Sequence, residues 1–104
     1  MARVCLNMIV KDEAHVLRRC LRSVEDQLPL REGACEIIVV DNASQDGSVE
    51  MMRAEFPDVS LIESQSNLGF GAGCNLAYGR STGRFVLLLN PDAVLTDHAI
   101  DGLL

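Results

Sequence analysis

The sequence predicts an α/β domain built on a mostly parallel sheet with helices on both faces. Short apolar segments alternate with helical patterns along all 104 residues, in the order βαβαβαβα. Connections of helix length between strands favour right-handed crossovers and parallel pairing. Residues 36–40 form a near-continuous apolar and β-branched segment, which is typical of a strand covered on both faces.

The first half of the chain begins with a predicted strand at Val4–Val10. Asp12 is predicted to cap the helix that follows, and Pro29 and Gly33 are predicted to end it. This helix has apolar positions at i, i+3, i+4 and i+7 spacing, namely Leu17, Cys20, Leu21, Val24 and Leu28. Residues 36–40 then form the second strand.

The second half repeats the alternation. A short helix follows the loop at residues 41–47 and ends at Pro57, and a shorter strand covers residues 59–62. The remaining predictions are a loop at 63–69, a helix at 71–80, a strand at 85–89 and a last helix capped by Thr96, with Ile100, Leu103 and Leu104 apolar.

The composition limits the classes of function. Fifteen acidic and nine basic residues give a formal net charge of −6, which argues against a polymeric nucleic acid partner but permits one nucleotide neutralised by a divalent cation. The length predicts one domain, residues 1–104, and no segment approaches the roughly 18 apolar residues of a membrane-spanning helix. With no room for a signal peptide before Val4 and no metal-binding cysteine spacing, we expect a cytoplasmic protein with reduced thiols.

Acidic side chains follow three of the predicted strands, at residues 11–13, 41–42 and 90–92. In an open α/β sheet, ligands bind outside the carboxyl ends of the strands. A carboxylate at this edge can bind a metal ion that in turn holds phosphate oxygens. The sequence therefore predicts a nucleotide site that uses a cation.

The loop after the second strand has two interpretations. Its turn and cap formers, Ser44, Asp46 and Ser48, are expected to bond to the backbone or to cap the next helix. Asp41 is predicted instead to accept a hydrogen bond from a base N–H or a ribose hydroxyl, because the last strand residue projects from the sheet edge.

Three glycines alternate before the third helix, at Gly69, Gly71 and Gly73. They do not form a dinucleotide fingerprint, because that pattern should follow the first strand of a βαβ unit. Two interpretations stay open: the glycines allow close approach to the neighbouring strand, or they allow the helix N-terminus to approach a phosphate.

The Asn90-Pro91-Asp92 segment also has two interpretations. Mg²⁺ and Mn²⁺ prefer oxygen ligands and are often held by one or two carboxylates plus substrate phosphates. Asp92 is therefore predicted to bind the metal, with Asn90 contacting the ribose or supporting the metal site. The alternative is a simple turn with proline at its second position.

Taken together, these motifs resemble the opening of family 2 glycosyltransferases over essentially the whole chain. The matching segments are residues 9–13, 17–24, 39–48, 67–75 and 88–92. The resemblance implies the N-terminal, Rossmann-like half of a GT-A fold, which binds a nucleotide-sugar donor. The segment at 90–92 is similar to the family's D-x-D position, with Asn in place of the first Asp as in rhamnosyltransferase-like members.

The resemblance also implies roles for single residues. Asp92 would hold Mg²⁺ or Mn²⁺ on the diphosphate. The donor nucleotide would be contacted by Val10, Lys11, Asp12, Glu13, Asp41, Asn42, Asn67, Gly69 and Asn90. The family's general base comes from an acceptor-binding half that follows these motifs, so no catalytic residue is assigned.

Two functions follow from these observations. The first is the donor-binding domain of an inverting glycosyltransferase of polysaccharide biosynthesis, using a UDP- or dTDP-sugar, with little transfer expected from the 104-residue chain alone. The alternative is a non-catalytic, truncated or degenerate GT-A module that self-associates or binds proteins through the face left by the missing acceptor half. A nucleotide-hydrolysing domain is disfavoured because no G-x-x-x-x-G-K-[ST] loop is present.

Overall fold

The computed structural model describes residues 4–27, 35–81 and 85–91. Asp92, the helix predicted after Thr96, and the predicted end of the first helix at Pro29 and Gly33 lie outside these ranges. The described elements are β1 (Val4–Val10), α1 (Ala14–Gln27), β2 (Cys35–Asn42), α2 (Ser48–Glu55), β3 (Ser60–Ser64), α3 (Gly69–Arg80) and β4 (Phe85–Leu88). No helix within the described ranges combines the length and apolarity needed to cross a bilayer.

The strands form one sheet in the order β3-β2-β1-β4, and all three pairings are parallel. The predicted parallel α/β fold is confirmed. The chain lays β2 and β3 successively on one side of β1 and then returns to place β4 on the other side. The strand order therefore reverses between β1 and β4, which is where open α/β sheets bind ligands.

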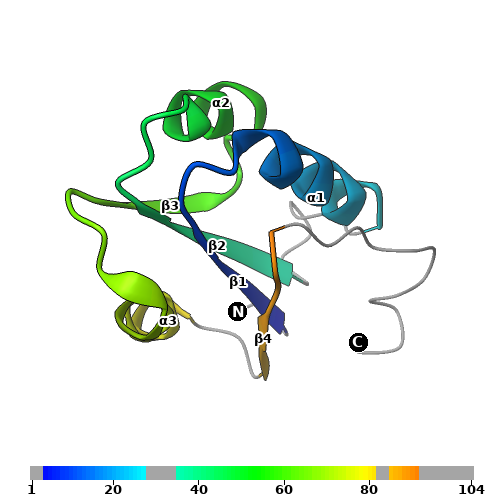
Figure 1. The fold of residues 1–104 in the computed structure, drawn as a ribbon. Coiled ribbons are helices and arrows are strands. Elements are labelled where there is room, and N and C mark those ends of the chain that lie inside the picture. Colours follow the sequence, from blue (N-terminus) through cyan, green and yellow to red (C-terminus); the bar gives the residue numbers. More distant parts are fainter. Residues whose placement is uncertain (1–3, 28–34, 82–84, 92–104) are drawn as a thin grey trace.

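Helices cover both faces of the sheet, as predicted. α1 and α2 lie together on one face and α3 lies on the other (Figure 1). Alternate strand residues separate into two cores because side chains of a strand point to opposite faces. The larger core, under α1 and α2, consists of Leu6, Met8, Val10, Leu17, Cys20, Leu21, Val24, Ile37, Val39, Met51, Met52, Phe56 and Val59. The smaller core, under α3, consists of Ile38, Val40, Ile62 and Ala77, with Ile9 packed against it.

Two element boundaries differ from the prediction at the carboxyl edge of the sheet. β2 extends to Asn42, two residues beyond the predicted strand, because Asp41 and Asn42 pair with Glu63 and Ser64 of a longer β3. α3 begins at Gly69 rather than at residue 71. Asp41 and Asn42 therefore belong to the sheet itself and are held by its ladder.

Gly73 brings α3 close to the sheet. A Cβ atom at this position would lie 2.8 Å from Ile9 Cγ2 and 3.6 Å from Asn42 Nδ2, whereas one at Gly71 would meet nothing within 4 Å. Gly69 has a φ of +80°, which favours glycine. For Gly73, the interpretation of close approach to a neighbouring strand is thus confirmed.

Candidate functional site

The loops that follow β1 and β2 are hydrogen-bonded to each other. Lys11 Nζ donates to the carbonyl of Ala43 over 2.8 Å. The Asp12 N–H donates to Ser44 Oγ over 2.8 Å, and the Asp12 carboxylate accepts from the Gln45 N–H over 2.6 Å. Because these bonds join positions about 32 residues apart, they hold the two loops together as one surface.

Asp46 connects this surface to two helices. One of its carboxylate oxygens accepts from the N–H of Ala14, the first residue of α1, over 3.0 Å. The other accepts from the N–H and the hydroxyl of Ser48, the first residue of α2. Desolvation raises the pKa of Asp46, but the hydrogen bonds from Ser48 and Ala14 outweigh it and leave the pKa below its ordinary value.

Asp46, rather than the predicted Asp12, therefore caps the first N–H group of α1. Asp12 has a φ of 52°, a left-handed conformation that is uncommon outside glycine, and its carboxylate is directed to Gln45. The prediction failed because the cap comes from a different loop, and sequence spacing carries no signal for such a contact.

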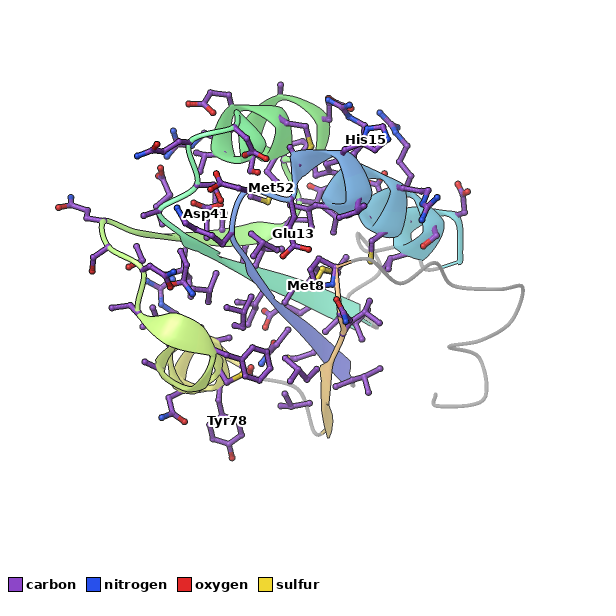
Figure 2. The ribbon with its side chains drawn as sticks, in the orientation of Figure 1. Met8, Glu13, His15, Asp41, Met52 and Tyr78 are labelled. Carbon is purple, nitrogen blue, oxygen red and sulfur yellow. The ribbon has the colours of Figure 1, made fainter. Side chains whose placement is uncertain are left out.

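Asp41 lies at the end of β2 beneath this loop surface and is only 2% exposed (Figure 2). Its Oδ2 accepts from the Ser44 N–H over 2.9 Å. Its Oδ1 is buried and has no hydrogen-bond partner among the residues that the structure describes. A buried polar atom without a partner costs free energy. This oxygen is therefore the position in the described structure where a donor is most clearly needed.

Asn42 fixes the start of α3 on the sheet. Its amide nitrogen donates to the Gly69 carbonyl over 3.3 Å, and its amide oxygen accepts from the Leu68 N–H over 3.4 Å. The side chain of Asn67 accepts from the Gly69 N–H over 2.9 Å. Three residues predicted to contact the nucleotide, Asn42, Asn67 and Gly69, thus bond to one another around the first turn of α3.

A crevice of about 440 Å³ lies between the ends of β1 and β4, beside the first turn of α3. Its volume falls in the range of roughly 300–1,000 Å³ that is usual for ligand sites. Two predicted site residues, Glu13 and Asn90, line it. Its other walls were not predicted and are Ile9, Phe70, Leu88, Leu89 and Pro91. The crevice coincides with the reversal of strand order described above.

Two predicted site residues, Val10 and Lys11, do not line the crevice. Val10 is 1% exposed and packs in the core under α1 and α2, so only its main chain reaches the sheet edge. Lys11 donates to Ala43, as noted, and its Nζ lies 3.3 Å from the Asp12 carboxylate. The predicted metal ligand Asp92 lies outside the described residues.

The polar groups lining the crevice suit a hard cation. Glu13 and Asn90 bring oxygen donors, which Mg²⁺ and Mn²⁺ prefer. Within residues 4–27, 35–81 and 85–91, no group of three or more His, Cys, Asp or Glu side chains is arranged to hold an ion by itself. This donor set fits an ion shared between a carboxylate and the phosphates of a ligand.

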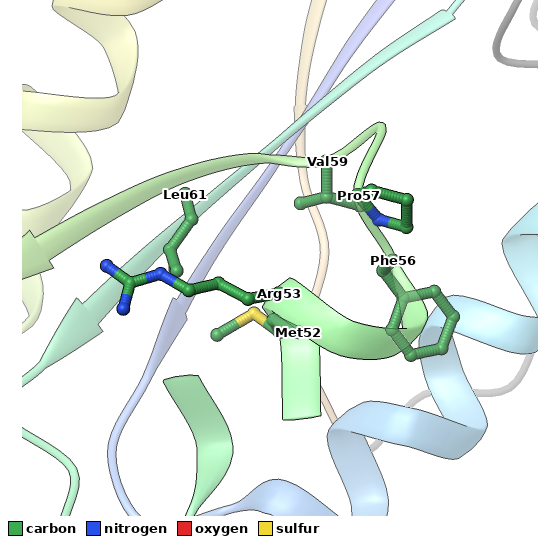
Figure 3. Close-up of a pocket in the computed structure, with 6 residues that line it drawn as sticks. All are labelled: Met52, Arg53, Phe56, Pro57, Val59 and Leu61. Carbon is green, nitrogen blue, oxygen red and sulfur yellow. The ribbon is translucent and has the colours of Figure 1, made fainter. Parts of the chain in front are cut away.

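A second pocket lies at the opposite end of the sheet, where α2 leads into β3 (Figure 3). Its volume is about 190 Å³, and its lining residues are Met52, Arg53, Phe56, Pro57, Val59 and Leu61. Arg53, its charged residue, pairs with the Glu63 carboxylate. The pocket is smaller than usual ligand sites and lies at the amino end of β3, so it is not a candidate for the nucleotide.

Sequence comparisons with known proteins agree with this geometry. A family model described as "Glycosyl transferase family 2" matches residues 5–104. The chain is 38% identical over 95 residues to a TPR repeat-containing protein of Synechococcus elongatus, covering 91% of this chain and 22% of that protein. It is 27% identical over 89 residues to the SPbeta prophage-derived glycosyltransferase SunS of Bacillus subtilis, covering 86% of this chain and 20% of SunS.

Solved structures show the same fold. The chain matches S. aureus TarS with a TM-score of 0.86 and 20% identity, covering 99% of this chain and 31% of that one. TarS has also been solved with UDP and with UDP-GlcNAc. The mannosyltransferase PcManGT of Pyrobaculum calidifontis, solved with GDP-Man and Mn²⁺, matches with a TM-score of 0.78 and 29% identity over 88% of this chain and 28% of that one. The chain thus spans less than a third of the length of each of these proteins.

Proposed function

This chain belongs to glycosyl transferase family 2, and from that premise we propose that its carboxyl-edge site binds the nucleotide-sugar donor of an inverting sugar transfer. The proposed donor is a UDP- or dTDP-sugar with Mg²⁺ or Mn²⁺ on its diphosphate. The fold places the β1, β2 and β4 ends at one edge, as such a donor requires.

The observation that carries this proposal is that Oδ1 of Asp41 is buried and has no hydrogen-bond partner among the described residues. Because Oδ2 already accepts from Ser44, the side chain offers one buried acceptor. Uracil and thymine present a single N–H between two carbonyls, whereas guanine presents two adjacent N–H donors on the same edge. One acceptor therefore favours a uridine or thymidine nucleotide over a guanosine nucleotide.

The proposed chemistry divides between this chain and a longer enzyme. In an inverting transfer, the acceptor oxygen forms a bond to the anomeric carbon while the bond from that carbon to the phosphate oxygen breaks, and the acceptor proton passes to a general base. We place that base in an acceptor-binding half, because this chain matches only 20–31% of the length of its relatives. When bound, the metal ion supplies Lewis-acid stabilisation of the departing diphosphate, and Asp92, two residues after Asn90 in the sequence, is its proposed ligand.

Calorimetric titration of UDP, dTDP and GDP, with and without Mn²⁺, tests this proposal. We expect metal-dependent binding of UDP or dTDP and at least tenfold weaker binding of GDP. Asp92→Ala should remove the metal dependence, and Asp41→Asn should weaken UDP binding by about tenfold, the equivalent of roughly 1.4 kcal/mol.

Asp58→Ala is the matched control, because Asp58 is exposed in the turn before β3, at the other end of the sheet. It should bind UDP like the unchanged chain. A folded protein that binds none of the three nucleotides would refute the donor site. Equal affinity for UDP and GDP would refute the assignment of the base.

One observation favours the alternative, a module that self-associates. Exposed large apolar side chains gather on α3, the residues before it and β4: Leu68, Phe70, Leu76, Tyr78, Val86 and Leu88. Apolar surface of this kind can drive association. Sedimentation at increasing protein concentration distinguishes the two functions, since a monomer across the range would remove the support for the module.

A further inference from the structure

We propose that Phe70 is the stacking platform for the nucleobase of the donor, a role that rests on the donor site proposed above. Phe70 lines the crevice between β1 and β4 and is 63% exposed. An aromatic ring left this open to water has an apolar face available for a planar ligand.

The aromatic residues of the chain leave no other candidate at this edge. The chain has three Phe, one Tyr and no Trp. Phe56 is buried at the end of α2, and Phe85 begins β4 at the amino end of the sheet. Tyr78 lies near the end of α3 and projects away from the sheet (Figure 2). Phe70 is thus the one aromatic residue of the chain at the carboxyl edge.

The position of Phe70 is fixed from two sides. The preceding residue, Gly69, is bonded through its carbonyl to the Asn42 side chain. One turn further along α3, Gly73 sits against Ile9, which itself lines the crevice. These contacts set the helix on the sheet, so that the ring projects from a rigid support, which lowers the entropic cost of stacking.

The contacts of α3 also indicate which part of the donor meets the ring. Asn42, which anchors the first turn of α3, is the neighbour of Asp41, the proposed acceptor for the base. Asn90, two residues before the proposed metal ligand in the sequence, lines the crevice from the end of β4. Phe70 and Asn90 thus line the same crevice, and the first turn of α3 links the ring to the end of β2, where the proposed base acceptor lies.

The test uses UMP and UDP with Mn²⁺ as probes and Tyr78 as a control on the same helix. Phe70→Ala should weaken the binding of both nucleotides by about tenfold, in line with the loss of one base–aromatic stack, and Tyr78→Ala should leave both unchanged. Thermal unfolding of the two variants shows that each is folded.

A fluorescence experiment separates stacking from a structural effect. Because the chain has no Trp, Phe70→Trp introduces a single reporter, and we expect UMP to quench its emission while the affinity is retained. Tyr78→Trp should show no quenching. Unchanged UMP affinity in Phe70→Ala, or an unquenched Phe70→Trp variant at saturating UMP, would overturn the proposal while leaving the donor site intact.

A third probe, UDP-GlcNAc, tests whether the Phe70 ring contacts the sugar rather than the nucleobase. If Phe70→Ala weakens the binding of UDP-GlcNAc but not of UMP or UDP, the ring contacts the sugar and the nucleobase assignment is refuted. If the unchanged chain binds no nucleotide with Mn²⁺, the donor site itself fails and the stacking role fails with it.

Discussion

Asp41 combines deep burial with one oxygen that has no partner among the described residues. If the proposed nucleotide is the partner of this oxygen, the protein is less stable without the nucleotide, since a buried polar group without a partner costs free energy. At this residue, stability and function are expected to oppose each other.

The variant Asp41→Asn tests whether stability and nucleotide binding change in opposite directions. An uncharged amide costs less to bury than a carboxylate, and it keeps an oxygen for the Ser44 N–H. We expect the free energy of unfolding in urea to rise by about 1 kcal/mol while nucleotide binding falls. Asp58→Ala is again the exposed control. A loss of stability in Asp41→Asn would mean that Oδ1 has a structural partner.

Asp46 predicts a pH dependence of stability. Its pKa is lowered in the folded protein: desolvation opposes the shift, and the hydrogen bonds from Ser48 and Ala14 produce it. A group with a depressed folded pKa contributes stability above its unfolded pKa and loses it as the pH falls through the folded value. The contribution of Asp46 is therefore present at neutral pH, begins to fall below about pH 4, and is lost as the pH passes through the lower pKa of the folded protein.

Asp46→Ala should lower the free energy of unfolding by about 1 kcal/mol at pH 7, because two helix starts lose an acceptor. The difference from the unchanged chain should shrink as the pH falls from about 4 to 2. Urea unfolding at a series of pH values measures both effects. If the two free energies of unfolding differ by the same amount across this pH range, the charge of Asp46 does not contribute to stability.

Among the elements, two glycine substitutions in α3 test the close approach of Gly73 to Ile9. Gly73→Ala and Gly71→Ala both gain helix propensity, but only the first places a methyl group against Ile9. We expect Gly73→Ala to be less stable than Gly71→Ala by about 1–3 kcal/mol, the usual cost of overpacking. Thermal unfolding of the pair measures this difference. Equal stability would show that α3 shifts outward at little cost.

Elements were predicted better than the contacts between them. The four strands, α1 and α2 follow from apolar patterns in the sequence, and the acidic residues after β1 and in β2 lie at one edge of the sheet. The cap of α1 by Asp46 and the loop contacts of Asp12 depend on tertiary structure and left no local pattern. Phe70 was visible only as one apolar residue among glycines, and its exposure depends on how α3 sits on the sheet.

At the scale of the whole molecule, we expect binding without turnover. The chain holds the proposed donor site but matches only 20–31% of the length of its relatives. Release of UDP from UDP-GlcNAc with Mn²⁺ and a mixture of hydroxyl acceptors should therefore be no faster than with Asp92→Ala. Faster release that depends on Asp92 would show that these 104 residues contain a complete active site.

The central position of β1 has a consequence for synthesis on the ribosome. β1 pairs with β2, about 30 positions later, but also with β4, so that Val4 must meet Phe85. The sheet as described can close only after residue 88 has left the exit tunnel, and until then one edge of β1 lacks its neighbour. An uncovered strand edge invites pairing with other chains. The arrangement that creates the crevice between β1 and β4 thus also sets the interval in which the nascent chain is most exposed to aggregation.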